Sequence, residues 1–331
     1  MMSVQVLCLG ECLYDRIFDR YDGDRPHTPF WVDYPGGAPA NVAVGLAKLG
    51  TRVGFIGSLG EDRQGQQLRS ILAEAGVDCS GVQRSPKPTR IVLVHRDRNG
   101  ERSFVGFSQP DPSSFADAYL DAQQLRPEWF AQANYLVMGT LGLAYPSLRP
   151  SLEQAMAWAQ NHGLTTVVDL NWRPGFWPQP DQAPPMVRAW VDRADVLKLN
   201  QSEAKWLFQS TTAAKILAQL GNAKAVLVTA GEQGCDYATA AGLQGHIPAF
   251  RVEGEDSTGA GDSFLAGFIH QLCQQGLLLL EQPEPLVAAL RYASAAGALT
   301  TTQSGAMAAQ PDASSLEAFL YLHPLSPGEN H

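Results

Sequence analysis

Residues 256–264 read DSTGAGDSF and precede an apolar run, a pattern that predicts a glycine-rich turn opening a helix. Small residues let backbone N–H groups at a helix N-terminus approach a phosphate closely. The amides of Gly259, Ala260 and Gly261 are therefore candidates for an anion hole. Asp262 would stand where a carboxylate can take a proton from a hydroxyl attacking that phosphate. The structural alternative is a turn capped by an aspartate.

A second glycine-rich stretch lies far upstream, where residues 35–41 read PGGAPAN and also open a predicted helix. Gly36 and Gly37 allow the backbone to approach a ligand, and the amide of Asn41 both donates and accepts hydrogen bonds. Asp15 follows the first predicted strand, where a carboxylate could hold two sugar hydroxyls. A tight turn and a solvated loop aspartate are the corresponding structural alternatives.

The whole-chain composition fits one large α/β domain or two ordinary ones. The chain has 331 residues, of which 45% are hydrophobic and 17% charged, and its net charge is -9. This acidic balance argues against nucleic acid as a partner. Five cysteines without a CxxC pair favour reduced thiols over a zinc site, and no leader or membrane span is visible. We therefore expect a cytoplasmic protein with no membrane association.

Strand and helix patterns alternate along most of the chain. Strands are predicted at residues 4–10, 53–56, 135–138, 165–169, 196–198 and 225–229. Helices are predicted at residues 41–49, 65–75, 147–162, 202–220 and 262–276. The alternation predicts an α/β fold with a mostly parallel sheet covered on both faces, and ligands at the carboxyl ends of its strands.

Two segments interrupt this alternation and predict a small β-rich lid. Residues 11–35 alternate around glycine and proline breakers, and residues 89–107 form two apolar runs around Asn99-Gly100, a hairpin turn signal. The lid would close over the sugar and exclude water. The remaining body is expected at residues 1–10, 36–88 and 108–323, and a frayed tail at 324–331.

Polar residues follow the predicted strands. Residues 169–173 read DLNWR, so Asp169, Asn171 and Arg173 would face one way if the chain stays extended. Arg173 could hold a phosphate with its planar fork. A structural pair between Asp169 and Arg173 is the alternative.

The next two strand ends suggest a nucleotide site. Asn200 and Glu203 have the spacing of a capping box, and the functional interpretation places Asn200 near phosphates and Glu203 near magnesium-bound water. Residues 229–234, TAGEQG, could cradle a nucleotide with Thr229, Gly231 and Gly234. The chain contains no GxGxxG or Walker motif, no HExxH and no Gly-x-Ser-x-Gly elbow.

Taken together, these motifs resemble the ribokinase (PfkB-type) carbohydrate kinase family, and within it the fructokinases. The resemblance spans about residues 4–315. It rests on Gly10-Glu11 with Asp15, on residues 36–50 (GGAPANVAVGLAKLG) with Gly57, Gly60, Asp62 and Gly65, and on residues 89–107, 169–174 and 256–262.

The resemblance implies a three-layer α/β/α fold with a β lid that often mediates homodimers. It implies ATP-dependent phosphorylation of a sugar or nucleoside hydroxyl, with Asp262 as general base and residues 259–261 as the anion hole. Magnesium accompanies ATP, and a monovalent cation such as potassium often orders the hole. The residues it assigns to the sugar are Asp15, Gly36, Gly37, Asn41 and Arg173. Those it assigns to ATP are Asn200, Thr229, Gly231, Gly234, Gly259, Gly261 and Ser294.

The resemblance also implies that Asn200 and Glu203 organise magnesium, and that Asp256, Thr258 and Gly305 hold the monovalent cation. Glu255 and Ser294 depart from the commonest family pattern. D-fructose is the expected acceptor. The alternatives are 2-keto-3-deoxygluconate, ribose or a nucleoside, or a catalytically weak member with a regulatory or interaction role.

Overall fold

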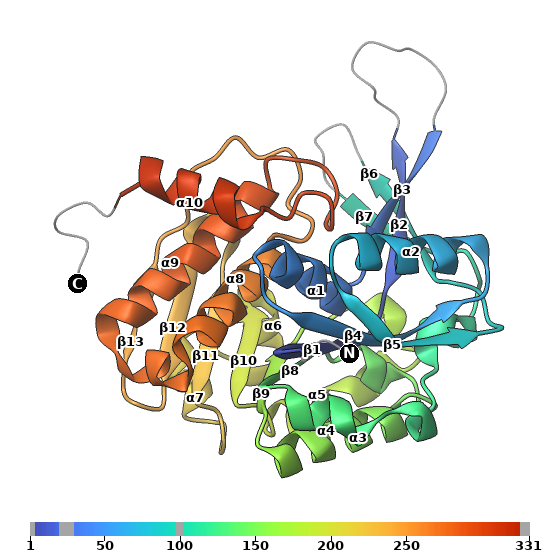
Figure 1. Cartoon of the computed structure of the whole chain (residues 1–331), viewed down its shortest axis with the longest axis horizontal. Coiled ribbons are helices and arrows are strands. Elements are labelled where there is room, and N and C mark those ends of the chain that lie inside the picture. The colour runs from blue at the N-terminus through green and yellow to red at the C-terminus, as the bar shows by residue number, and fades with distance from the viewer. Residues whose placement is uncertain (1–3, 20–29, 97–101, 325–331) are drawn as a thin grey trace.

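The computed structural model describes residues 4–19, 30–96 and 102–324, which form two sheets and their covering helices (Figure 1). The larger sheet has nine strands. In spatial order they are β13 (Gln244–Ile247), β12 (Cys235–Thr239), β11 (Ala225–Thr229), β10 (Val196–Asn200), β9 (Thr165–Asp169), β8 (Tyr135–Met138), β1 (Val6–Leu9), β4 (Val53–Gly60) and β5 (Asp78–Ser85). β11 pairs antiparallel with β12, and β12 with β13, whereas the other pairings are parallel.

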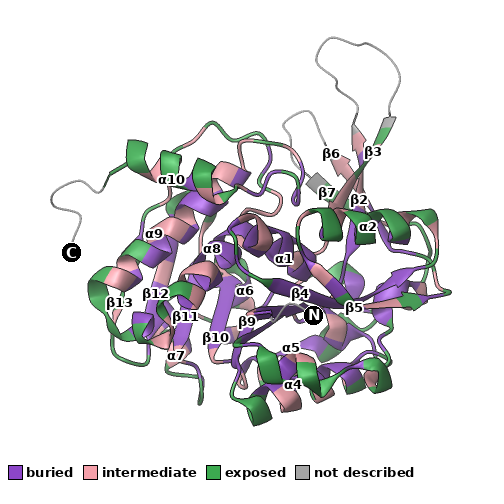
Figure 2. Cartoon of the chain, viewed as in Figure 1, coloured by how far each residue is buried: buried purple, intermediate pink, exposed green. Residues whose placement is uncertain are grey.

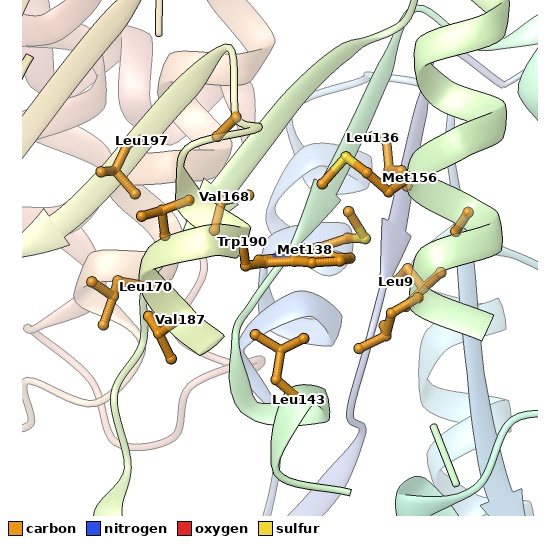
Figure 3. Close-up of a cluster of buried hydrophobic side chains, with 14 of the residues drawn as sticks. Leu9, Leu136, Met138, Leu143, Met156, Val168, Leu170, Val187, Trp190 and Leu197 are labelled. Carbon is orange, nitrogen blue, oxygen red and sulfur yellow. The ribbon is translucent and has the colours of Figure 1, made fainter. Parts of the chain in front are cut away.

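Helices cover both faces of this sheet, and each face has its own apolar core. One core takes side chains from α1 (Ala38–Lys48), α2 (Arg63–Glu74), α8 (Ala260–Gln275) and α9 (Pro283–Thr300). The other takes them from α3 (Pro127–Gln132), α4 (Arg149–His162), α5 (Ala183–Val191), α6 (Gln201–Phe208) and α7 (Ala213–Leu217). Figure 3 shows part of the second core, where Met156 of α4 and Trp190 of α5 lie near Met138 of β8.

Burial follows from this layering. Every residue of β1 and β4 is buried, because strands covered on both faces have no solvent side. Figure 2 shows the central strands buried and the outer faces of the helices exposed. The predicted three-layer α/β/α architecture with a mostly parallel sheet is confirmed. None of the helices in the described ranges has the length and apolar character needed to cross a membrane.

A smaller sheet of four strands projects from one end of the larger one (Figure 1). Its order is β3 (Phe30–Gly36), β2 (Leu13–Asp19), β6 (Ile91–Arg96) and β7 (Arg102–Phe107). The segments predicted as a β-rich unit therefore do pair, and β2 and β6 run parallel. The predicted Asn99-Gly100 turn and the tail after Pro324 lie outside the described residues.

The predicted helix at 202–220 is wrong as a single element. The chain forms α6 and α7, separated by Gln209, which adopts a left-handed conformation with φ 55°. The polar residues 209–212 favour helix ends and turns over helix interiors, which explains the break. No prediction from the sequence covered β5, β12, β13, α3, α5, α9 or α10 (Ala313–Leu322).

Candidate active site

The turn before α8 requires small residues. Gly259 is the N-cap of α8 with φ 80°, and a Cβ there would lie 2.9 Å from the Ala306 backbone. Asp256 holds the turn by accepting hydrogen bonds from the Thr258 backbone N–H at 3.0 Å and its hydroxyl at 2.8 Å. The first N–H groups of a helix lack intrahelical acceptors and carry partial positive charge. The predicted anion hole, residues 259–261, therefore coincides with the start of α8.

Asp262, in the first turn of α8, meets Asn41 of α1. Asn41 Nδ2 donates to Asp262 Oδ2 at 2.7 Å. Asn41 is buried, and its Oδ1 has no hydrogen-bond partner in the described structure. A buried acceptor without a donor is costly unless a ligand satisfies it. The two glycine-rich stretches singled out in the sequence thus lead into one site.

Burial raises the pKa of the Asp262 carboxyl to about 6, and the negative charge of Asp169 adds to this effect. Lys198, the Asn41 hydrogen bond and Arg173 oppose the rise. A carboxylate with this pKa is ionised at neutral pH and still basic enough to accept a proton.

The Gly36-Gly37 turn lies against the loop that follows β1. Gly37 has φ 106°, and a Cβ there would lie 2.5 Å from the Glu11 carbonyl oxygen. A Cβ on Gly36 would come within 3.0 Å of Asp15 Oδ2, so the predicted sugar residues Asp15, Gly36 and Gly37 are neighbours. Glu11 Oε1 accepts from the Ala38 N–H at 3.1 Å, and burial raises the pKa of Glu11 to about 7.

The segment after β9 departs from prediction. Asn171 has φ 45°, so the chain is not extended there and the three polar side chains do not alternate as in a strand. Asp169 pairs with Lys198 at 2.8 Å, so the proposed structural pair with Arg173 is wrong. Arg173 is exposed and donates to the Trp172 carbonyl at 3.0 Å.

The capping box at the start of α6 is confirmed. Glu203 N–H donates to Asn200 Oδ1 at 2.9 Å, and Asn200 N–H donates to Glu203 Oε2 at 2.8 Å. The other carboxylate oxygen, Oε1, accepts from the Trp172 N–H at 2.7 Å. Glu203 therefore ties the loop after β9 to the start of α6. Its burial raises the pKa of the carboxyl.

The predicted ATP residues are spread over neighbouring elements. Thr229 ends β11, beside Asn200 at the end of β10. Gly231 and Gly234 both have positive φ, and a Cβ on Gly234 would overlap the Ile247 carbonyl oxygen at 2.0 Å. Ser294 lies on α9, where its hydroxyl donates to the Pro248 carbonyl at 3.5 Å.

The residues predicted for a monovalent cation come together at one loop junction. Asp256 Oδ2 accepts from the Gly305 N–H at 3.1 Å, while Oδ1 holds Thr258. Glu255 accepts from the Ser304 hydroxyl at 2.8 Å, which adds a second link between the same loops. Within the described ranges no group of three His, Cys, Asp or Glu side chains could hold a metal ion.

Two buried charged residues at this site were given no role of their own from the sequence: Glu11 was noted only within the Gly10-Glu11 motif, and Lys198 was not singled out. Lys198 interrupts the buried strand β10, and Glu11 directly follows the buried strand β1. A charged residue within or directly after an apolar strand is a usable signal, because such groups are rarely buried without a partner.

Comparison with known proteins agrees with this geometry. Residues 4–313 match the family described as pfkB family carbohydrate kinase. A probable fructokinase-3 from Arabidopsis thaliana is 33% identical over 96% of this chain and 91% of its own length. A fructokinase from Xylella fastidiosa with bound ATP superimposes with a TM-score of 0.87 at 31% identity, over 97% of this chain and 99% of that chain.

A fructokinase from Vibrio cholerae O395 in a fructose, ADP and calcium ion bound form has a TM-score of 0.83 and 31% identity, over 96% of this chain and 99% of that chain. The family match covers nearly the whole chain, and these relatives align over almost their full lengths. The chain belongs to the pfkB family of carbohydrate kinases, which are phosphotransferases with an alcohol group as acceptor.

Proposed function

We propose that the protein phosphorylates D-fructose with ATP to give fructose 6-phosphate and ADP. The observation that carries the proposal is the hydrogen bond between Asn41 and Asp262 at the first turn of α8. It supports a carboxylate placed beside the N-terminus of α8, where a proton acceptor and backbone N–H groups can act on the same transferring phosphoryl group. The fructokinase relatives support fructose as the acceptor.

In the proposed reaction Asp262 accepts the proton of the attacking sugar hydroxyl. The hydroxyl oxygen forms a bond to the γ-phosphorus, and the bond from that phosphorus to the β–γ bridging oxygen breaks. Backbone N–H groups of residues 259–261 donate to the oxygens of the transferring group and stabilise its charge. The partial positive charge of the α8 N-terminus acts in the same direction.

Asp15, Gly36, Gly37, Asn41 and Arg173 are proposed to bind the sugar. Asn41 offers its unpaired Oδ1 to a sugar hydroxyl while its Nδ2 stays on Asp262. The Asp15 carboxylate and the Gly36-Gly37 backbone are adjacent, which supports a shared hydroxyl-binding surface.

Asn200, Thr229, Gly231, Gly234, Gly259, Gly261 and Ser294 are proposed to bind ATP. The lack of a carboxylate cage in the described structure fits magnesium, which keeps several waters and binds mainly through substrate phosphates. Asn200 and Glu203 would hold its waters, and the ion would neutralise charge on the phosphates. Asp256, Thr258 and Gly305 offer oxygen ligands suited to potassium.

The smaller sheet is proposed as the lid. The lid would comprise residues 11–35 and 89–107, and the body residues 1–10, 36–88 and 108–323, as the sequence predicts. Phe104 of β7 covers Gly175, beside Arg173, since a Cβ on Gly175 would lie 2.7 Å from its ring. Trp31 and Val105 are exposed on the same sheet, which supports a homodimer through it.

Five free cysteines support a cytoplasmic location.

Coupled release of ADP across a panel of acceptors tests the proposal. D-fructose should give a higher kcat/KM than ribose, adenosine or 2-keto-3-deoxygluconate, in assays with and without potassium. A clear preference for one of those three would show that fructose is not the acceptor, but the protein would still be a kinase. Failure to transfer phosphate to any acceptor would contradict the proposed function and favour a regulatory role.

A further inference from the structure

An aspartate–lysine pair is buried beside the proposed general base. Lys198 Nζ lies 2.8 Å from Asp169 Oδ2, and the two side chains are only 8% and 6% exposed. The parallel register of β9 and β10 places the two residues side by side. Burying such a pair costs much of what its attraction returns, so stability alone is a weak reason for it.

The ammonium group lies directly beneath the start of α8. A Cβ added to Gly261 would come within 2.9 Å of Lys198 Nζ. Gly261 belongs to the proposed anion hole and precedes Asp262. Asp169 Oδ1 is buried and has no partner in the described structure, so a network of structural hydrogen bonds does not account for the pair.

The two members of the pair act on Asp262 in opposite directions. Asp169 raises the pKa of the Asp262 carboxyl, and Lys198 lowers it. Two other charged groups interact with this carboxyl, Arg173 from the loop after β9 and Glu11 from the loop after β1. Glu203 of α6 interacts with both Asp169 and Lys198, and burial raises the pKa of its carboxyl as well. Removing one member of the pair should therefore shift the pKa of Asp262, whereas removing both members should shift this pKa less.

We propose that Asp169 and Lys198 are positioning residues for phosphoryl transfer: Asp169 holds the Lys198 ammonium beneath Gly261, where it supports the first turn of α8 and faces the Asp262 carboxylate. The inference rests on the proposed role of Asp262. It makes the buried pair part of the catalytic machinery without direct contact to the reacting atoms.

The test is the pH profile of kcat/KM for fructose at saturating ATP and Mg²⁺. Lys198→Met should move the acid limb to higher pH and Asp169→Asn to lower pH, each by about half a unit or more. Lys198→Arg keeps the charge, so its limb should stay near the wild-type position even if its kcat falls. General damage to the fold would not shift the limb in opposite directions.

The double variant Asp169→Leu/Lys198→Met covers the case in which a single variant does not fold. Replacing both charges with apolar side chains should leave the protein folded, with a lower kcat and a limb near that of wild type. Lys224→Met, which breaks an aspartate–lysine pair at the other edge of the sheet, should leave the limb unchanged.

The outcomes separate this inference from the proposed function. If the wild-type protein transfers phosphate to no acceptor, the proposed function fails. If Asp262→Asn keeps its activity, another group is the base and the positioning role fails while the kinase function stands. If Asp262→Asn is inactive while folded Lys198→Met and Asp169→Asn keep the wild-type limb, only the positioning role is overturned. A double variant with wild-type kcat would also overturn it.

Discussion

Two aspartate–lysine pairs lie at opposite ends of the central parallel strands, and they differ in burial more than in distance. We call the side where these strands end the carboxyl edge of the sheet, and the side where they begin the amino edge. At the carboxyl edge Asp169 and Lys198 are 2.8 Å apart and almost fully buried. At the amino edge Asp195 and Lys224 are 3.0 Å apart, with side chains 23% and 44% exposed. The same chemistry thus occurs in two dielectric environments.

The two edges also differ in how far their polar atoms are satisfied. Asp195 Oδ2 accepts from the Thr166 N–H at 2.8 Å and its hydroxyl at 2.9 Å. At the carboxyl edge Asp169 Oδ1 and Asn41 Oδ1 are buried without a partner in the described structure. Unsatisfied groups cost stability and are retained where a ligand uses them. The unsatisfied groups at the carboxyl ends of the strands therefore support the proposed reaction site there, and the satisfied pair at the amino ends supports a structural role.

The largest expected effect on kcat follows from replacing Asp262, the proposed base at the carboxyl edge. Asp262→Asn should lower kcat by about 10²–10⁴-fold, because the amide cannot accept the proton. ATP binding measured by calorimetry should persist, and the melting temperature should be unchanged or higher because a desolvated carboxylate is removed. A variant that keeps most of the wild-type kcat would show that another group is the base.

A smaller loss should follow when the anion hole is crowded. The Cβ of Gly261→Ala would displace Lys198 Nζ or the turn, and loss of one donor of this kind lowers kcat by about 10²–10³-fold. Gly221→Ala is the matched control, because nothing lies within 4 Å of a Cβ there. Equal kcat values for the two variants would remove the proposed role of the 259–261 backbone.

At the amino edge the expected effect is on stability. Asp195→Ala removes the acceptor of Thr166 and the partner of Lys224, so the free energy of unfolding should fall by about 1–3 kcal/mol. Urea denaturation measures the change. The kcat per folded molecule should stay at the wild-type value, and a large loss of kcat would mean that this edge also serves the reaction.

The smallest effect is expected from Lys224→Met. An exposed ion pair contributes little, so the free energy of unfolding should change by at most about 1 kcal/mol. The change should shrink further at high salt. A larger and salt-independent loss would mean that the two pairs are more alike than their burial indicates.

The sequence predicted the parts of the site that depend on local backbone chemistry. Gly37 and Gly259 adopt positive φ values that glycine tolerates, and the capping box of Asn200 and Glu203 is a fixed spacing. The buried strands of the body were also predicted, because parallel strands covered on both faces appear as apolar runs.

Long-range contacts were not predictable in the same way. Asn41 and Asp262 are 221 residues apart, and both were singled out without any sign that they would bond to each other. The pairing of Asp169 with Lys198 depends on the register of β9 and β10, which no local pattern specifies. α9 was missed because its alanine-rich sequence is apolar on most sides and shows no clear amphipathic stripe.

The most direct test of the central claim is the pH dependence of kcat/KM for D-fructose in the wild-type protein at saturating ATP and Mg²⁺. Asp262 must be ionised to accept a proton, so activity should rise with pH through an acid limb at about pH 6. Negative charge from bound phosphates would raise the pKa of the Asp262 carboxyl, and the positive charge of Mg²⁺ would oppose that rise. An acid limb near the usual carboxyl range of about 4 would contradict the account. So would an Asp262→Asn variant that keeps the wild-type limb.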